Sequence, residues 1–166
     1  MARRPSFDPF AILAALDRRR VAYVVIGSFA RVVRGAEELP GGLDIVPSLR
    51  SQNLERLEEA LADLQAVGAD GARISFDETG DTLVGATSPA GELKIVPEPE
   101  GTRGYDDLRR AATREPLGRG LRPSVASTGD LARMLAALGR DEDRPKLQAL
   151  RQVAELERSL GPELAL

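Results

Sequence analysis

The stretch that decides the fold is VAYVVIGSFARVVR, residues 21–34. Its first part, Val21 to Ile26, is apolar and largely β-branched, which favours a buried strand. Gly27 and Ser28 end that strand, and the residues from Phe29 to Arg34 predict a short helix. The chain is therefore expected to turn from a strand into a helix at a Gly-Ser pair.

This turn has the features of a phosphate site. Gly27 lets the backbone approach a ligand closely, and the N–H groups beyond it, with the Ser28 hydroxyl, are suited to phosphate oxygens. Arg31 lies one helical turn beyond Ser28 on the same side and adds a cation. The sequence thus predicts nucleotide or phosphate binding by Gly27, Ser28 and Arg31. The alternative is that Gly27 and Ser28 only turn the chain and cap the helix.

Two further short strands each carry one charged residue among apolar neighbours. In GLDIVP (42–47) the side chains of residues 42 and 44 share one face, and Asp44 needs a metal, a cation or solvent to offset its burial. In ELKIVP (92–97) the charged residue inside the strand is Lys94.

The remaining elements surround these strands. We expect helices at about 10–20 (capped by Asp8), 51–68 (capped by Ser51), 105–112, 129–138 (capped by Ser127) and 143–160, and strands at 73–77, 82–87, 92–96 and 121–125, with a hairpin turn at 88–91. No repeat or interior linker interrupts the pattern. One α/β domain over residues 1–166 is expected, with the C-terminal helix packed on it.

Composition narrows the chemistry that the chain can perform. Of its 166 residues, 42% are apolar and 30% are charged, the balance of a globular domain. Cysteine and histidine are absent, which excludes disulfides, Cys or His zinc sites, thiol nucleophiles and Ser-His-Asp triads. Any bound metal must have oxygen ligands, which points to magnesium or manganese.

Charge and hydropathy restrict the partners. The formal net charge of −3 argues against coating of DNA, which needs a broad basic surface, but it is compatible with a local basic patch. No apolar run approaches the roughly 20 residues that span a bilayer. The first residues, MARRPSFDPF, lack the apolar segment of a signal peptide. We therefore expect a cytoplasmic protein without a membrane partner.

In this order and spacing the motifs resemble those of the nucleotidyltransferase superfamily, the polymerase-beta-like fold. YVVIGSFARVVRG (23–35) is similar to its strand and Gly-Ser turn, GGLDIVP (41–47) to its Asp-x-Asp strand, and ELKIVPEPEGTRGYDDLRRAA (92–112) to its third-carboxylate strand and next helix. VASTGDLARMLAALGR (125–140) resembles the helix that follows. The resemblance covers about residues 10–150 and points to small bacterial abortive-infection or toxin-type domains. It implies a small mixed β-sheet flanked by helices.

The departures from the family pattern concern its acidic residues. In the family, three carboxylates bind two magnesium ions, and the third also favours deprotonation of the attacking hydroxyl. By this resemblance Asp44 is the one retained metal ligand and catalytic carboxylate, whereas Gly42 and Lys94 stand where the other two are expected. A single carboxylate near an ammonium should bind Mg²⁺ poorly. The resemblance therefore implies impaired two-metal chemistry.

Lys94 suggests a substitute for the metal. We hypothesise that it lies across the sheet from Asp44, and that its fixed charge, with Arg31, holds a triphosphate or another anion without metal. An inert ion pair in a decayed site is the alternative. Other acids that could complete a metal site are Glu37, Glu38, Asp81 and Glu92, none of which stands at a family position.

Two classes of function remain open. As an enzyme, the protein transfers a nucleoside monophosphate from a triphosphate to RNA, protein or a small molecule, as a toxin of a toxin–antitoxin pair would. As a binding protein, it holds a nucleotide or a partner protein without turnover. The replaced carboxylates favour impaired or lost transfer. The arginines between residues 103 and 122 either contact RNA near the cleft or form a solvated helix face.

Overall fold

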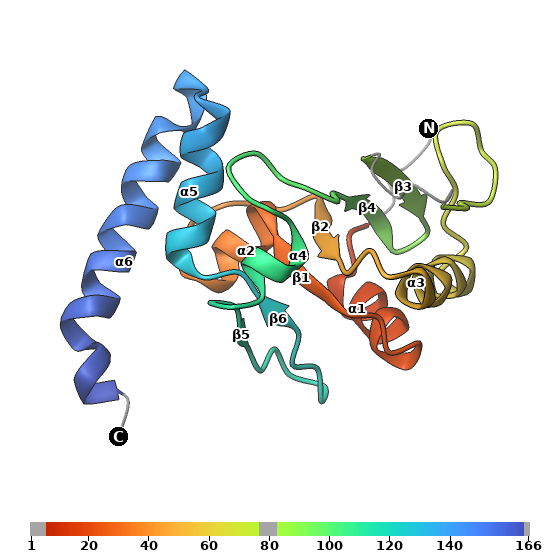
Figure 1. Cartoon of the computed structure of the whole chain (residues 1–166), viewed down its shortest axis with the longest axis horizontal. Coiled ribbons are helices and arrows are strands. Elements are labelled where there is room, and N and C mark those ends of the chain that lie inside the picture. Colours follow the sequence, from red (N-terminus) through yellow and green to blue (C-terminus); the bar gives the residue numbers. More distant parts are fainter. Residues whose placement is uncertain (1–5, 77–82, 165–166) are drawn as a thin grey trace.

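The computed structural model describes residues 6–76 and 83–164, which form a six-stranded sheet with helices against it (Figure 1). The strands are β1 (Tyr23–Ile26), β2 (Gly42–Pro47), β3 (Val84–Ser88), β4 (Gly91–Ile95), β5 (Thr113–Arg114) and β6 (Ser124–Val125). The helices are α1 (Pro9–Arg18), α2 (Gly27–Val33), α3 (Ser51–Asp63), α4 (Tyr105–Leu108), α5 (Thr128–Leu138) and α6 (Arg144–Leu164), with a 3-10 turn at Asp141–Asp143. The predicted mixed α/β architecture is confirmed.

Strand pairing brings the sequence motifs to the middle of the sheet, whose order is β3-β4-β2-β1-β6-β5. β2 runs antiparallel to β1 and parallel to β4, so the sheet is mixed. Asp44 of β2 stands opposite Ile26 of β1 and opposite Lys94 of β4. The end of β1, the middle of β2 and the middle of β4 therefore meet in one row across the sheet.

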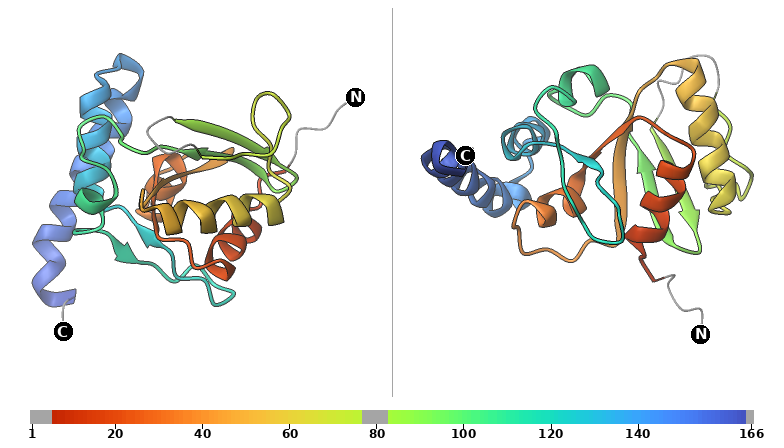
Figure 2. Two further views of the ribbon diagram at one scale, coloured as in Figure 1. Left: turned by 45° about the vertical axis from the view of Figure 1, so that its right-hand side comes forward. Right: turned by 90° about the horizontal axis from the view of Figure 1, so that it is seen from below.

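Alternation along β2 and β4 separates a core face from an open face. Leu43, Ile45, Leu93 and Ile95 are buried in the core, at 2% exposure or less. Helices α1 and α3, which lie side by side, supply the other half of this core (Figure 2). The intervening residues of β2 and β4, Asp44 and Lys94 among them, point to the opposite, more exposed face.

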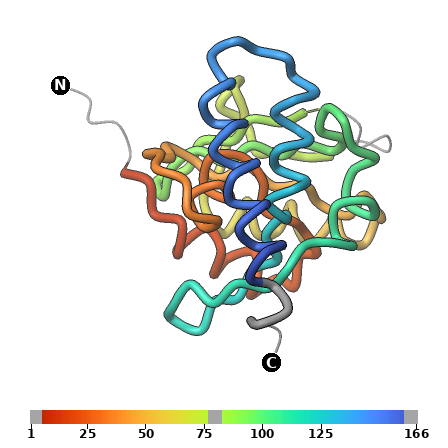
Figure 3. The backbone as a smooth tube through the Cα atoms, turned by 90° about the vertical axis from the view of Figure 1, so that its left-hand side faces the viewer, coloured from red at the N-terminus to blue at the C-terminus, as the bar shows by residue number. Residues whose placement is uncertain are grey.

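The C-terminal part adds a second group of helices. α5 packs against α2, and the long α6 then packs along α5 (Figure 3). Leu131 and Leu135 of α5 and Leu150 of α6 are buried. None of the helices in the described part of the chain combines the length and the apolar surface that crossing a bilayer requires.

Three local predictions are confirmed. The Asp8 side chain accepts a hydrogen bond from the Ala11 N–H at 3.1 Å and caps α1. The Ser127 hydroxyl accepts one from the Asp130 N–H at 3.0 Å and caps α5. β3 and β4 form the predicted antiparallel hairpin. Each of these features depends on residues close together in the sequence.

Other local predictions are wrong. Ser51 is the first residue of α3 rather than its cap, and no side chain caps that helix. Of the strand predicted at 73–77, residue 77 lies outside the described residues, and the rest contributes only a bridge from Arg73 to Val67. The helix predicted at 105–112 ends at Leu108, because the chain then continues into β5. The sequence did not predict β5, because a strand of two residues is too short to show an alternating pattern.

Candidate functional site

The site is built around the turn between β1 and α2. Gly27 has φ +75°, in the left-handed region that glycine adopts at little cost. A Cβ atom on Gly27 would lie 2.5 Å from Oδ2 of Asp44, closer than any real contact. Only glycine therefore allows the Asp44 carboxylate to lie against this turn. Ser28 follows Gly27, and both residues line a cavity together with Asp44.

Asp44 and Lys94 are register partners on two parallel strands. Their side chains share the open face of the sheet, and Asp44 is half-buried whereas Lys94 is exposed. They form no direct ion pair, so the inert Asp44–Lys94 pair considered from the sequence is not made. The Lys94 ammonium is left available to a ligand.

The protonation of Asp44 reflects its burial. Burial raises the pKa of Asp44 above its ordinary value, and the positive charges of Lys94 and Arg31 offset this rise only in part. The Asp44 carboxyl group is therefore harder to ionise than that of an exposed aspartate.

We expect Asp44→Asn to raise the melting temperature at neutral pH by a few degrees. With a raised pKa in the folded state, Asp44 loses its proton more readily on unfolding, so it lowers stability as the pH rises above about 4. Asparagine removes this cost. Thermal unfolding between about pH 3 and 8 measures the difference, which should vanish at the acid end. An equal gain at both ends would contradict the assignment.

Arg31 is already paired with an acidic residue. Its guanidinium donates two hydrogen bonds to Glu38, at 2.7 and 2.9 Å, and the two side chains are only 11% and 13% exposed. Lys146 of α6 lies 3.7 Å from the same carboxylate. Arg31 still lines the cavity next to Ser28, but the cation predicted for phosphate is largely neutralised by Glu38.

Two cavities meet at Asp44. One has a volume of about 420 Å³ and extends toward α5, where Leu131 and Leu135 line it. The other, of about 440 Å³, extends over Gly42 and Glu92 on the open face of the sheet. Ser28, Asp44 and Lys94 line both. Volumes of this size are typical of small-molecule sites.

Sequence reasoning missed three charged residues of the first cavity: Glu98, Glu100 and Arg140. Glu98 and Glu100 lie just beyond β4, inside the third motif (92–112). Their place in that motif was the one feature of the sequence that could have indicated them. Arg140 follows α5 and pairs with Asp143 at 2.6 Å. No local pattern indicates that the chain beyond α5 reaches this cavity.

The acidic side chains around Asp44 do not fit the magnesium site that the resemblance implies. Across residues 6–76 and 83–160, no group of three acidic side chains is placed to hold a metal ion. A Cβ atom on Gly42 would lie 2.8 Å from the Glu92 carbonyl oxygen, so the first carboxylate cannot be restored there without moving β4. Among the alternative acids, Glu38 is bound to Arg31, and Asp81 lies outside the described residues.

The arginines between residues 103 and 122 line neither of the Asp44 cavities. Arg109 pairs with Asp106 at 3.4 Å, and the Arg119 guanidinium lies 4.5 Å from the Phe10 ring centroid. Arg114 and Arg122 line a separate cavity beside Tyr23.

Comparison with known proteins identifies the fold. No family model matches the sequence, and no curated protein matches it significantly. A candidate nucleotidyltransferase from Thermotoga maritima superposes with a TM-score of 0.59 at 16% identity, over 87% of this chain and 90% of that one. The antibiotic-resistance factor ANT(2'')-Ia superposes with a TM-score of 0.58 at 17% identity, over 93% and 83%.

A further match supports the same assignment. An antigenic nucleotidyltransferase-like protein from Paracoccidioides brasiliensis superposes with a TM-score of 0.51 at 17% identity, over 88% of this chain and 72% of that one. The chain thus has the nucleotidyltransferase fold.

Proposed function

We propose that this protein binds a nucleoside triphosphate in the Asp44 cavities and that nucleotidyl transfer to an RNA, protein or small-molecule acceptor is impaired or lost. The observation that carries the proposal is Lys94. It is exposed, it stands in register with Asp44, and it lines both cavities. An ammonium there repels a divalent cation and attracts phosphate oxygens.

The other cations of the first cavity are already engaged. Arg31 is bound by Glu38 and Arg140 by Asp143, whereas Lys94 has no acidic partner within the residues that the structure describes. Lys94 is therefore the cation that supplies charge to a ligand phosphate, and the Ser28 hydroxyl is placed to donate a hydrogen bond. When the Asp44 carboxyl group is ionised, it repels a bound anion.

The structural neighbours support a nucleotide as the ligand. ANT(2'')-Ia has been crystallised with adenylyl-2''-tobramycin, and that structure superposes on this chain with a TM-score of 0.56 at 16% identity. Two cavities that meet at one carboxylate offer room for a nucleotide and for a second group. In this chain, binding of the nucleotide is the part that is retained.

Calorimetric titration with each nucleoside triphosphate in EDTA tests the proposal. We expect binding without metal, weakened roughly tenfold or more in Lys94→Gln because a charge-assisted hydrogen bond is lost. Asp44→Asn should strengthen binding roughly three- to tenfold, since it removes a nearby negative charge. Arg151→Gln, an equal charge change on an exposed residue of α6, is the control and should bind like the wild type. Binding that requires Mg²⁺ and disappears in Asp44→Asn would overturn the proposal.

An active, toxin-like transferase is the second candidate, favoured by Glu98 and Glu100, which line the same cavity as Asp44. Labelled triphosphates with Mg²⁺ or Mn²⁺ and total RNA or protein as acceptor distinguish the two. A labelled product that is lost in both Asp44→Asn and Glu98→Gln would establish the transferase. Absence of product, with metal-independent binding retained, favours the nucleotide-binding protein.

A further inference from the structure

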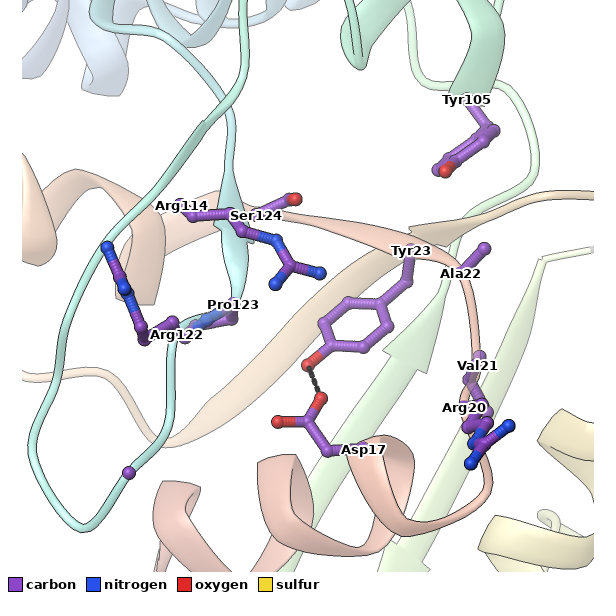
Figure 4. Close-up of a pocket in the computed structure, with 11 residues that line it drawn as sticks. Asp17, Arg20, Val21, Ala22, Tyr23, Tyr105, Arg114, Arg122, Pro123 and Ser124 are labelled. Atoms are coloured by element: carbon purple, nitrogen blue, oxygen red, sulfur yellow. Dashed lines mark hydrogen bonds between the residues drawn. The ribbon is translucent and has the colours of Figure 1, made fainter.

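Arginines gather at the end of β1 that lies away from the Asp44 site. Tyr23 begins β1, three residues before Ile26 and therefore about 10 Å along the strand. A cavity of about 470 Å³ lies beside Tyr23 (Figure 4). It is lined by Arg20, Arg114 and Arg122, which come from the turn after α1, from β5 and from the segment before β6.

A second cavity, of about 230 Å³, adjoins the first. Ala22 and Tyr105 line both cavities, so the two are neighbours on the surface. The arginines of the second cavity are Arg50, Arg56 and Arg109. We call the two cavities together the basic groove. Tyr105 lines both of its cavities, and each cavity has three arginines in its lining, although the chain as a whole is acidic.

Few carboxylates balance these charges. Asp17 accepts a hydrogen bond from the Tyr23 hydroxyl at 3.2 Å, and Asp106 pairs with Arg109 at 3.4 Å in an exposed contact. Throughout the described part of the chain, no ion pair is made by the other arginines of the groove, which are Arg20, Arg50, Arg56, Arg114 and Arg122. Cations held together in this way repel one another, and an anion from outside would offset that repulsion.

Tyr105 supplies an aromatic surface in the middle of the groove. Its side chain is half-buried and points from α4 toward β1 (Figure 4). The Arg109 guanidinium lies 5.9 Å from the centroid of its ring. Arg114 projects into the space beside Tyr23 (Figure 4). A positively charged groove with an aromatic ring in it suits single-stranded nucleic acid, because phosphates meet cations while a base stacks on the ring.

We propose that the basic groove binds a short single-stranded segment of nucleic acid, with phosphates on both sides of Tyr105 and one base on its ring. The site is separate from the Asp44 cavities and does not depend on the function proposed for them. An acidic peptide also offers negative charge, but it offers nothing to stack on Tyr105. The ring therefore favours nucleic acid.

Fluorescence anisotropy with a labelled twelve-nucleotide oligouridine tests the proposal, with oligothymidine as a second arm. We expect binding that weakens with rising salt, since phosphate contacts release counterions. Arg114→Glu in the first cavity and Arg56→Glu in the second should each weaken binding roughly tenfold or more. Arg151→Glu on α6 is the matched control and should have little effect. Circular dichroism verifies that each variant is folded.

Three further variants distinguish base stacking on Tyr105, and binding at the basic groove rather than at the Asp44 cavities, from a general effect of charge. Tyr105→Phe should bind like the wild type, whereas Tyr105→Ala should lose about fivefold or more, the lower range for one stacked base. Lys94→Gln should retain oligonucleotide binding, and saturating ATP should not displace the oligonucleotide. The proposal fails if Arg151→Glu weakens binding as much as Arg114→Glu. It fails equally if Tyr105→Ala binds like the wild type or if oligoglutamate competes as well as oligouridine.

Discussion

Replacing Arg31 with methionine is expected to lower the free energy of unfolding by about 3–5 kcal/mol, the cost of breaking a buried ion pair from one side. Arg31 and Glu38 share two short hydrogen bonds and are mostly shielded from solvent. Without the guanidinium, the Glu38 carboxylate keeps only Lys146, at 3.7 Å. Urea unfolding of the purified variant measures the loss.

A double-mutant cycle separates the pair from its surroundings. Arg31→Met with Glu38→Gln should recover much of the stability, because no unpaired buried charge remains. Arg31 lowers the pKa of Glu38, so the stability that the pair contributes is present above about pH 4.3 and is lost as the pH falls through the lowered pKa. A loss in Arg31→Met that persists unchanged at about pH 2, or that the second substitution does not relieve, would show that packing rather than charge is responsible.

Gly27→Ala should cost about 2–4 kcal/mol. The left-handed backbone alone costs an alanine roughly 1–2 kcal/mol, and the new methyl group would meet Oδ2 of Asp44 at 2.5 Å. The Asp44 carboxylate must therefore move away from the turn. We also expect metal-free binding of triphosphate to change in this variant, because the geometry at Ser28 and Asp44 changes with it.

Gly71→Ala is the matched control for Gly27→Ala. Gly71 has φ +76°, nearly the same as Gly27, and a Cβ atom placed on it would meet nothing within 4 Å, so only the backbone cost of roughly 1–2 kcal/mol remains. Adding Asp44→Ala to Gly27→Ala removes the carboxylate that the methyl group meets and should restore part of the lost stability. Chemical denaturation of the variants checks this. Equal losses at positions 27 and 71 would mean that the contact with Asp44 carries no cost.

Contacts of Glu38 and Asp143 join the Asp44 site to the C-terminal helix. Glu38 is held by Arg31 of α2 and lies within reach of Lys146 of α6. Asp143, which is 3% exposed, accepts from Arg140 at the rim of the first cavity. The chain beyond α5 is thus part of the structure that shapes the site.

The sequence by itself determined the central strands, the turn at Gly27 and the caps at Asp8 and Ser127, because these depend on neighbouring residues. A β-branched run favours a strand wherever it is placed. A serine or aspartate before a helix finds its N–H groups within three residues. The order of the motifs was enough for the fold, and it also placed Asp44 and Lys94 on strands.

Only the tertiary structure decided how the charges are used. Arg31 and Glu38 are seven residues apart with a loop between them, and the sequence offered no reason to pair them. The approach of β4 to Gly42, which leaves no room for a side chain, arises from strand packing rather than from either strand alone. The basic groove draws its arginines from segments far apart in the sequence. Long cationic side chains reach many positions, so the folded surface selects their partners.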